Sequence, residues 1–507
     1  MIPLLTGAEM KDIERDLMSQ GVSLETLIDR AASALCSTVQ ELAPRGPILI
    51  LAGPGNNGAD GAGAAMLLSA AGREVTVYGV SRPEPGYAGF TFVNGDDDRD
   101  LARLTALRDA SSIIVDALLG TGQNRGPEGL MAALIEAINQ HGKAPMSLSV
   151  DVPTGVSTDT GVVAGSAFRA DVTLCLGFGK RGTAVYPGAE FAGTTRVAPI
   201  GIPRQAASAV RVWAPEPADI AARLPRRPQA SNKGESGRVL LVSGSRDFTG
   251  APTLCAMGAY RAGAGLVEIA TPAGNVATVA SHSLEPVYLP LPERDGRIDG
   301  GAVPALASAM EKARTVVVGP GLGFSGETVE AMRGILNAMA EKRIASGVID
   351  ADGLNALAHI HEWWGVDLPL VLTPHPGEMS RLTGSSIQEI QADRVGIAQR
   401  HAARWGKVVV LKGAGTVIAH PDGKTAVNPT GSSNLATAGT GDVLSGIIGG
   451  LLAQGSAPWD AAMVGVYMHG KAGDILRDQQ GDVGMIASDL LSKVPAARQA
   501  ILRETDR

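Results

Sequence analysis

The stretch PILILAGPGNNGADG, residues Pro47 to Gly61, contains the three features that decide the fold. The apolar run PILILAG predicts a buried strand, and GPGNNG supplies a glycine-rich turn. A helix is expected to follow, from Asp60 to Ala71. A strand, a tight turn and a helix in this order are typical of one unit of a parallel α/β sheet.

The same alternation continues along the chain. Further strands are predicted at EVTVYGV, SIIVDALLG, MSLSVD and VTLCLG, with a helix from Glu128 to His141. After Gly237 the alternation resumes with RVLLVSG, GLVEIA, TVVVGPGLG, GVIDADG, LPLVLTPH, KVVVLKGAG and TVIAHP. A long helical stretch is expected from Ser386 to Trp405. The fold class is therefore α/β, with parallel sheets between layers of helices.

The length of 507 residues is too great for one ordinary core, so two domains are expected. The segment WAPEPADIAARLPRRPQASNKGESG, from Trp213 to Gly237, contains four prolines and many small or charged residues. We place the first domain at residues 1–214, a linker at 215–232 and the second domain at 233–507. A short helix, Ala218–Leu224, is expected inside the linker.

Composition excludes several classes of partner. The net charge is −7 without long blocks of one sign, which favours neither nucleic acid nor an anionic membrane. No apolar run approaches the ~20 residues of a membrane span, and the N-terminus reads as a helix with Thr6 and Glu9 in capping-box spacing. Three cysteines without a CxxC pair fit a reducing compartment. We expect a cytoplasmic protein.

The first glycine loop matches GxGxxG, a pattern that alone is a weak signal for a dinucleotide site. Two features disfavour a Rossmann dehydrogenase. Asp60 falls in the expected first helical turn, where it would repel a bound phosphate. The second strand, REVTVYGVSR, ends without the acid that takes the ribose hydroxyls.

Polar side chains at strand ends suggest a different site. Asp116 ends SIIVDALLG and Asp151 ends MSLSVD, and ligands of open parallel sheets bind at the carboxyl ends of strands. Taken singly, each acid is equally well explained as the cap of a turn. Together with Asn57 and Asp60 they favour a common site, whose amide and carboxylate oxygens suit a hard cation.

The motifs GPGNNGADG, VDALLGTGQNRG and SVDVPTGVSTDTG, in this order, resemble NAD(P)H-hydrate epimerase, a Rossmann-like doubly wound family, over about Leu5 to Pro203. The resemblance implies a potassium ion held by Asn57, Asp116 and Thr154, and Asp151 as the acid/base group. Ala59 replaces a glycine of the family's loop. The implied contacts to the hydrated cofactor are Asn56, Asn57, Gly58, Ala59, Asp60, Gly120, Thr121, Gly122, Gln123, Asn124, Arg125, Gly126 and Asp151.

A second glycine loop, ATAGTGDVLSG, spans Ala436 to Gly446. Val443, Ile447 and Leu451 follow at helical spacing, so Asp442 lies where a helix begins. The backbone N–H groups of Gly439 to Gly441 would form an anion pocket, in which Asp442 could take a proton from a hydroxyl that attacks phosphorus. The alternative is that Asp442 only caps the helix. No GxxxxGK[ST] pattern is present, which excludes a P-loop enzyme.

This loop, with NKGESGRVLLVSGS, VVVGPGLG, VIDADGLNAL, TPHPGEMSRLTG and VVVLKGAGT, resembles ADP-dependent NAD(P)H-hydrate dehydratase, a ribokinase-like family, over about Asn232 to Pro495. The resemblance implies magnesium with ADP, and Asp442 as the base. The implied nucleotide contacts are Lys412, Gly413, Ala414, Gly415, Thr416 and Gly441. The implied contacts to the hydrated cofactor are Ala251, Gly321, Gly323, His375 and Asp442.

Three positions in this second part have structural alternatives. His375 lies between two prolines, and a structural role for it is as well supported as ligand contact. Asp350 and Asp352 are read as structural, with Asp352 as the N-cap of a helix ending at Leu357. The sequence TGSSN, at residues 430–434, departs from the family's Thr-Gly-Asn-Pro-Gly, so no nucleotide contact is assigned to it.

The two resemblances together imply a bifunctional enzyme that repairs hydrated NADH and NADPH (NADHX and NADPHX). One domain would interconvert the two epimers, and the other would dehydrate one epimer with ADP. The small molecules NADHX, NADPHX and ADP are the expected partners, and the sequence leaves a homo-oligomer open. The alternative is a ribokinase-like kinase for a vitamin precursor, joined to a non-catalytic nucleotide-binding module.

Overall fold

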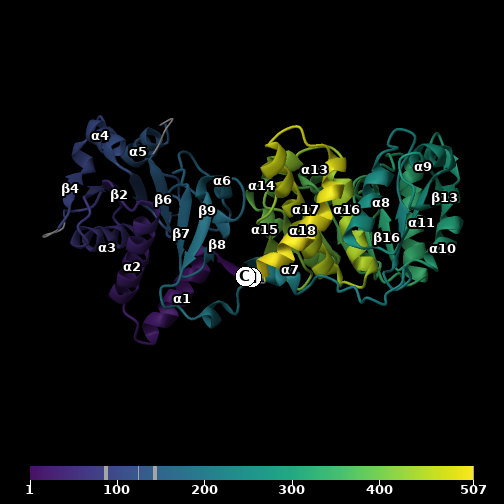
Figure 1. Cartoon of the computed structure of the whole chain (residues 1–507), viewed down its shortest axis with the longest axis horizontal. Coiled ribbons are helices and arrows are strands. Elements are labelled where there is room, and N and C mark those ends of the chain that lie inside the picture. Colours follow the sequence, from purple (N-terminus) through teal and green to yellow (C-terminus); the bar gives the residue numbers. More distant parts are fainter. Residues whose placement is uncertain (85–88, 124, 141–144, 506–507) are drawn as a thin grey trace. The chain divides into compact units, whose positions relative to one another are not determined.

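A computed structural model describes residues 1–84, 89–123, 125–140 and 145–505 (Figure 1). The chain forms two compact units: Ile2–Ala214, and Pro215–Arg507 together with Met1. Both are built on sheets of mainly parallel strands with helices on the two faces, which confirms the α/β fold class. None of the helices in the described ranges is long and apolar enough to cross a membrane.

The first unit contains a seven-stranded sheet in the order β4-β3-β2-β5-β6-β7-β9. All of its strand pairs are parallel. The chain therefore proceeds outward from β2 in one direction and then in the other, as in a doubly wound fold. The strands are β2 (Ile48–Ala52), β3 (Val75–Gly79), β4 (Thr91–Asn94), β5 (Ile113–Ala117), β6 (Met146–Val150), β7 (Val172–Leu176) and β9 (Thr194–Ala198).

Alternate residues of these strands face two separate cores. Ile48 and Ile50 pack with α2 (Leu24–Leu42) and α3 (Asn56–Ala70). Leu49 and Leu51 face the opposite core, with α4 (Ala102–Ala110) and α5 (Gly129–Asn139). This division follows from the two-residue period of a strand, which sends neighbouring side chains to opposite faces.

The remaining elements of this unit close one end of it. α1 (Gly7–Ser19) begins at the predicted capping box, in which Thr6 accepts from the Glu9 N–H and Glu9 accepts from the Thr6 N–H. β1 (Ile2–Leu5) pairs with β8 (Gly179–Lys180) and with β10 (Val212–Ala214). A short helix, α6 (Gly188–Ala192), precedes β9.

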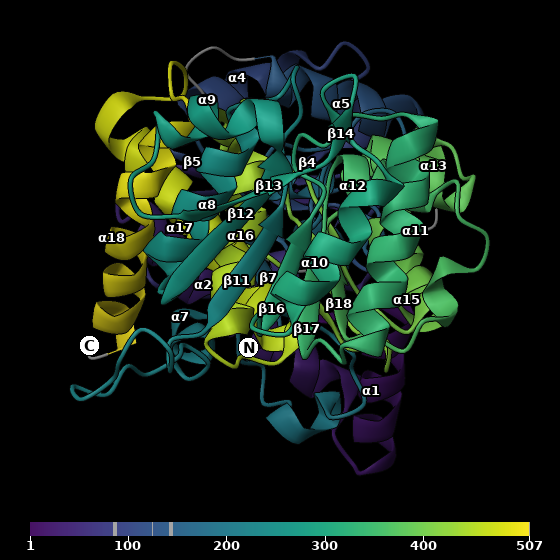
Figure 2. The ribbon, with the colours of Figure 1, turned by 90° about the vertical axis from the view of Figure 1, so that its right-hand side faces the viewer.

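The sheet of the second unit has the strand order β13-β12-β11-β16-β17-β18-β19-β20-β21 (Figure 2). The pairs from β13 to β19 are parallel, and those from β19 to β21 are antiparallel. Two short strands, β14 (Glu293–Arg294) and β15 (Arg297–Ile298), form a separate hairpin. The strands are β11 (Arg238–Val242), β12 (Leu266–Pro272), β13 (Val287–Leu291), β16 (Thr315–Val318), β17 (Ser346–Ile349), β18 (Leu370–Leu372), β19 (Val408–Leu411), β20 (Val417–Ala419) and β21 (Thr425–Val427).

One face of this sheet is covered by α8 (Ala251–Ala262), α16 (Thr440–Ala453), α17 (Pro458–Gln480) and α18 (Ala487–Thr505). The pair α8 and α16 is in very close contact, because a Cβ atom built on Gly446 would lie 2.0 Å from the carbonyl oxygen of Cys255. The other helices include α9 (Val276–Ala280), α10 (Val303–Met310), α11 (Gly326–Glu341), α12 (Asp352–Leu357), α13 (Pro376–Thr383), α14 (Ile387–Ala392) and α15 (Arg394–Trp405).

Several predicted helix boundaries are wrong. The stretch predicted as one helix from Ser386 to Trp405 is two helices, α14 and α15, because Asp393 interrupts it and caps α15 through the Gly396 N–H. The helix predicted to begin at Asp60 begins at Asn56, directly after the glycine turn. The helix predicted from Glu128 to His141 is α5, and His141 lies outside the described residues.

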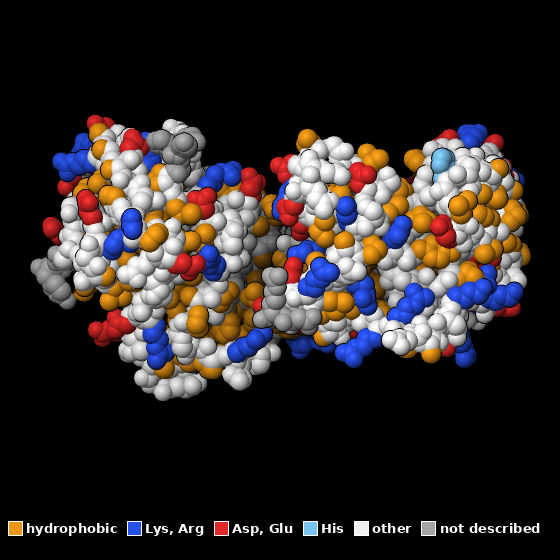
Figure 3. Space-filling view, in the orientation of Figure 1, with side chains coloured by type: hydrophobic (Ala, Val, Ile, Leu, Met, Phe, Trp, Pro, Cys, Tyr) orange, Lys and Arg blue, Asp and Glu red, His pale blue; other side chains and the backbone are white. Residues whose placement is uncertain are grey.

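The segment 215–232 is only partly exposed. Its first half forms α7 (Pro217–Ala221), shorter than the predicted Ala218–Leu224 and shifted toward the N-terminus. Ile220 and Leu224 are buried in the core of the second unit, where α7 packs against α18. Residues 226–235 are mostly exposed. On the face drawn in Figure 3, acidic and basic side chains are interspersed over the surface.

Limited proteolysis tests this division. We expect the first tryptic cut after Arg226 or Lys233, because both are exposed while the preceding α7 is packed against α18. Mass spectrometry of the earliest fragments should show two pieces that meet in this segment. An earliest cut inside residues 238–505 would contradict the proposed boundary.

Candidate active sites

The loops that follow β2, β5 and β6 meet at the carboxyl edge of the first sheet. The side-chain amide of Asn57 donates to the carbonyl oxygens of Leu119, at 3.0 Å, and Val150, at 3.3 Å. The hydroxyl of Thr154 accepts from the Leu119 N–H at 3.0 Å. Three predicted motifs that are distant in the sequence are therefore joined by hydrogen bonds.

Asp116 is fully buried at this junction, and four hydrogen bonds compensate its carboxylate. Thr154 donates from its N–H at 2.8 Å and from its hydroxyl at 2.7 Å. The Leu118 N–H and the Ser149 hydroxyl supply the other two. Burial raises the pKa of Asp116 to about 6 in spite of these donors.

Asp151 lies directly after β6 in the left-handed region, at φ +68°, which is uncommon for a residue other than glycine. Its Oδ1 atom accepts from the Leu176 N–H at 3.0 Å and from the ammonium of Lys180. Lys180 is completely buried and also donates to the carbonyl oxygens of Leu176 and Phe178, at 3.0 Å each. The sequence analysis missed Lys180, although a lysine directly after the apolar run VTLCLGFG was a usable signal.

Asp60 differs from these two acids, because no hydrogen bond to its buried carboxyl is found in the described part of the chain. Burial, and then the nearby carboxylates of Asp151 and Glu14, raise the pKa of Asp60 to about 8. Burial and Asp151 also raise the pKa of Glu14, which α1 brings to this edge. The guanidinium of Arg82 opposes the shift on Asp60 and donates to the Gly53 carbonyl at 2.8 Å.

The remaining predicted contacts of the first unit fall into two groups. Gln123 is tied to the 153–156 turn, because its amide donates to Val156 O at 2.7 Å and accepts from the Gly155 N–H at 2.8 Å. Gly58 and Gly126 are packed so tightly that a Cβ atom on either would lie 1.9 Å from a carbonyl oxygen. Asn124 lies outside the described residues. Asn56 and Ala59 lie in the first turn of α3, and Gly120, Thr121, Gly122 and Arg125 lie in the loop after β5; all six are exposed or partly buried.

In the second unit, α16 begins at Thr440, with Gly439 as its N-cap in the left-handed conformation. Gly439 has no side chain to cap the helix, and Asp442 is the third helical residue. The alternative that Asp442 serves as the N-cap is therefore wrong. The Thr440 N–H donates to the Thr437 carbonyl at 3.4 Å, whereas no acceptor within the described residues is found for the N–H groups of Gly439, Gly441 and Asp442, which can face an anion.

Lys412, directly after β19, lies beside this helix start. Its ammonium is 2.6 Å from Asp350 Oδ1 and 3.8 Å from Glu378 Oε2. A Cβ atom on Gly441 would lie 3.5 Å from the same ammonium. Burial alone would lower the pKa of Lys412, but the carboxylates of Asp350 and Glu378 hold it above its usual value.

Asp442 faces this group of charges without a hydrogen bond in the described residues. Burial, followed by the Asp350 carboxylate, raises the pKa of Asp442 to about 7, against the opposing effect of Lys412. The side chain is thus divided between acid and carboxylate near neutral pH. A group with this pKa is suited to proton transfer at neutral pH.

His375 and Asp352 have roles that the sequence assigned incompletely. His375 is the N-cap of α13, where its Nδ1 atom accepts from the N–H groups of Gly377 and Glu378, and half of its side chain stays exposed. The prediction that Asp352 is an N-cap is wrong, because Ala351 holds that position. Asp352 instead accepts from the Gly323 N–H at 2.9 Å and so ties two loops together.

Of the other predicted contacts of the second unit, Ala251 begins α8 and the rest lie in loops that follow strands. A Cβ atom on Gly321 would lie 2.9 Å from Ala251 Cβ, so these two positions adjoin. Gly323 and Gly321 both have positive φ, which their loop requires. Gly413, Ala414, Gly415 and Thr416 form an exposed or partly exposed turn, held by a 2.8 Å bond from Thr416 to Gly413 O.

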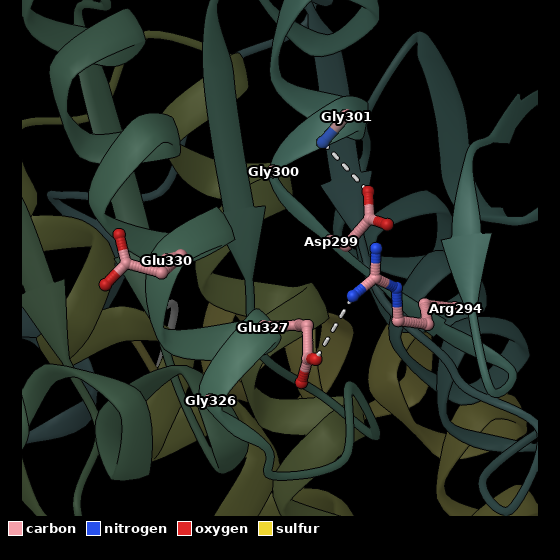
Figure 4. Close-up of a pocket in the computed structure, with 7 residues that line it drawn as sticks. All are labelled: Arg294, Asp299, Gly300, Gly301, Gly326, Glu327 and Glu330. Atoms are coloured by element: carbon pink, nitrogen blue, oxygen red, sulfur yellow. Dashed lines mark hydrogen bonds and ion pairs between the residues drawn. The ribbon is translucent and has the colours of Figure 1, made fainter.

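A surface pocket in this unit lies apart from these residues (Figure 4). Arg294 of β14 and Glu327 of α11 form an ion pair across it at 3.7 Å. None of the predicted site residues lines this pocket, so we assign it no role. Its lining consists of Arg294, Asp299, Gly300, Gly301, Gly326, Glu327 and Glu330.

Comparison with known proteins accounts for both units. A family model described as NAD(P)H-hydrate dehydratase matches residues 239–496, and one described as YjeF-related protein N-terminus matches residues 24–182. The bifunctional NAD(P)H-hydrate repair enzyme of Moorella thermoacetica is 38% identical over 99% of this chain and 98% of its own length. The chain belongs to the bifunctional NAD(P)H-hydrate repair enzyme family. The member from Escherichia coli is 35% identical, over 93% of this chain and 89% of its own.

Solved structures match the second unit of this family member. The ADP/ATP-dependent NAD(P)H-hydrate dehydratase of Bacillus subtilis, co-crystallised with ATP and Mg²⁺, is 33% identical. The match covers 57% of this chain and 99% of the Bacillus subtilis chain, with a TM-score of 0.50. A ribokinase-like protein of Enterococcus faecalis is 25% identical over 57% of this chain and 96% of its own, with a TM-score of 0.51. The second unit is therefore ribokinase-like.

The buried pair of Lys180 and Asp151 generates a stability prediction. Lys180→Met should destabilise the first unit by about 3 kcal/mol, because it leaves the Asp151 carboxylate without its cation. Calorimetry of the full chain should show a lower midpoint for one transition only. The double variant Lys180→Met/Asp151→Asn should regain much of the loss, and an unchanged midpoint in the single variant would contradict the pairing.

Proposed function

We propose that this protein repairs hydrated NADH and NADPH with two separate active sites. The first unit interconverts the epimers of the hydrate, and the second dehydrates one epimer at the expense of ADP. The observation that carries the proposal is the position of Asp442. It is a carboxyl group with a raised pKa, lying next to free helix N–H groups and a lysine ammonium.

This arrangement suits phosphoryl transfer to a hydroxyl group. The N-terminus of α16 and Lys412 face the phosphate that is transferred, and they stabilise its negative charge. Asp442 accepts the proton as the hydroxyl oxygen of the hydrate attacks the terminal phosphorus, and the bond from that phosphorus to the remaining nucleotide breaks. Phosphate then leaves from the ring carbon, and a proton is lost from its neighbour to restore the double bond.

Different residues around this site would bind the hydrate and the nucleotide. Ala251, Gly321 and Gly323 would bind the hydrate, and the turn from Gly413 to Thr416 would bind the nucleotide. Half of the His375 side chain is exposed and can be reached by a ligand, although its Nδ1 atom is used for the cap and its Nε2 atom lies 3.3 Å from Glu378 Oε1. Magnesium would enter bound to the nucleotide phosphates, because the described residues contain no group of three acids, histidines or cysteines around one point.

In the first unit, Asp151 would move the proton and the loops at residues 56–60 and 120–126 would bind the hydrate. A potassium ion would be held by Asn57, Asp116 and Thr154, which offer oxygen donors and one negative charge. Both protons of the Asn57 amide are given to carbonyl groups, so its oxygen is left to face an ion. The ion would add a positive charge near the developing negative charge of the ring. We place the activity in the cytoplasm, where these cofactors and reduced thiols occur together.

Asp442→Asn should lower the dehydration rate by ~100-fold or more, because the amide cannot accept the hydroxyl proton. The rate of the native enzyme should rise with pH through about 7, as Asp442 loses its proton. The rate loss in the variant and the pH dependence of the native enzyme are both measured from the ADP-dependent recovery of reduced nicotinamide absorbance. Epimer exchange by the same variant is the control, and a fall of less than a few-fold would remove the base role from Asp442.

Asp151→Asn should leave dehydration of the accepted epimer unchanged. A site that aims one base and one phosphoryl group at a single hydroxyl position accepts one configuration, since reacting atoms must lie within about 3–3.5 Å. With a mixture of epimers and excess ADP, the variant should therefore show a fast phase that stops part-way and a slow tail. Both phases would be visible in progress curves of the absorbance of reduced nicotinamide.

Two additions make that experiment decisive. Adding the Asp442→Asn variant, whose first unit is unchanged and which supplies only the exchange activity, should restore the fast phase. Replacing potassium by a large organic cation should slow exchange in the native enzyme and lengthen the tail. Clearance of the whole mixture by Asp151→Asn at the native rate would show that the first unit is a binding module and not an epimerase.

A further inference from the structure

The carboxylate of Asp350 lies at the centre of the second site, although the sequence suggested only a structural role. It follows β17 directly, and its side chain is 1% exposed. Its Oδ1 atom holds the Lys412 ammonium at 2.6 Å, and its Oδ2 atom accepts from the Ser445 hydroxyl of α16 at 2.6 Å. One carboxylate thus joins the lysine after β19 to the helix that carries Asp442.

The location of this link matters for a transferred phosphate. Lysine side chains are flexible, and an untethered ammonium at this depth could take several positions. A Cβ atom on Gly441 would lie 3.5 Å from Lys412 Nζ and 3.9 Å from Asp350 Oδ2, so the linked pair lies against the first turn of α16. Glu378 Oε2, at 3.8 Å, is the second carboxylate that faces the ammonium.

We infer that Asp350 is a positioning residue of the dehydratase site, which fixes the Lys412 ammonium against the first turn of α16 while Ser445 holds the carboxylate in place. Asp350 acts on the transferred phosphate through Lys412 and does not touch the reacting atoms. It also acts on Asp442 through its charge. The inference rests on the proposed function, since it gives the pair a role in the same phosphoryl transfer.

Several ionisable groups surround Asp442. Burial raises the pKa of Asp442 most, the carboxyl groups of Asp350, Asp352 and Glu378 raise it further, and Lys412 lowers it. Burial also raises the pKa of Glu378 to about 7, and Asp350 adds to that shift, so removing the Asp350 charge lowers both pKa values. Cys255 of α8 and His469 of α17, which are buried in the covering helices, are neutral near pH 7. Burial raises the pKa of the Cys255 thiol of α8 well above its usual value, and burial lowers the pKa of His469 of α17 to about 4.

Asp350→Asn removes a negative neighbour and leaves the Lys412 charge less compensated. Both changes lower the pKa of Asp442. We therefore expect the acid limb of the dehydration rate to move to lower pH by about one pH unit. The plateau rate should fall by about ten- to a hundred-fold, because Lys412 is no longer held against the helix. Both are read from the ADP-dependent recovery of reduced nicotinamide between about pH 5.5 and 8.5.

Ser445→Ala is the matched control, since it removes the other hydrogen bond of Asp350 but no charge. Its acid limb should stay in place, and its plateau should fall by no more than a few-fold. A merely structural Asp350 would lower the plateau in Asp350→Asn without moving the acid limb. That result, or an unchanged profile in every respect, would overturn the inference.

A double-mutant cycle covers the case in which the buried, unpaired lysine prevents Asp350→Asn from folding. Asp350→Asn/Lys412→Met removes both charges of the pair and should fold. If Asp350 acts on the phosphate through Lys412, the double variant and Lys412→Met should share one plateau rate within about two-fold. A further large loss in the double variant would overturn the inference. Failure of the native chain itself to recover reduced nicotinamide would instead refute the proposed function.

Discussion

A carboxylate removed from water must be matched by donors or by a cation, and both sites are organised around this requirement. Asp116 is matched by four hydrogen bonds, Asp151 by Lys180, and Asp350 by Lys412 and Ser445. Asp60 and Asp442 lack such partners, and their pKa values rise to about 8 and about 7. Asp116 and Asp350 thus hold loops in place, and Asp442 is left able to exchange a proton near neutral pH.

The two units meet this requirement in the same way, with a lysine paired to a carboxylate. In each, a lysine from one strand end is bound to an acid from another: the fully buried Lys180 to Asp151, and the partly buried Lys412 to Asp350. The difference lies in which acid the lysine takes. In the first unit it binds the proposed proton-transfer group itself, whereas in the second it binds a neighbour and leaves Asp442 unpaired. The second arrangement keeps a positive charge available for a phosphate.

Much of this was readable from the sequence, because strand ends of a parallel sheet share one edge. The apolar runs and glycine turns therefore predicted the fold class and which loops lie together, and the Thr6–Glu9 spacing predicted a helix start. The pairing of Lys180 with Asp151 and of Asp350 with Lys412 was not identified. The members of these pairs are 29 and 62 positions apart in the sequence, and the contacts depend on side-chain direction. Asp352 was misread because an aspartate suits both the N-cap and the first turn of a helix.

The close contact between α8 and α16 limits what evolution or a protein engineer can change. With a carbonyl oxygen of α8 only 2.0 Å from where a side chain at Gly446 would begin, any substitution there forces the helices apart. Asp442 travels with α16, so such a change moves the reactive group as well. Variation in substrate preference has to arise in the surrounding loops, and libraries that sample the interior of these two helices will consist largely of inactive sequences.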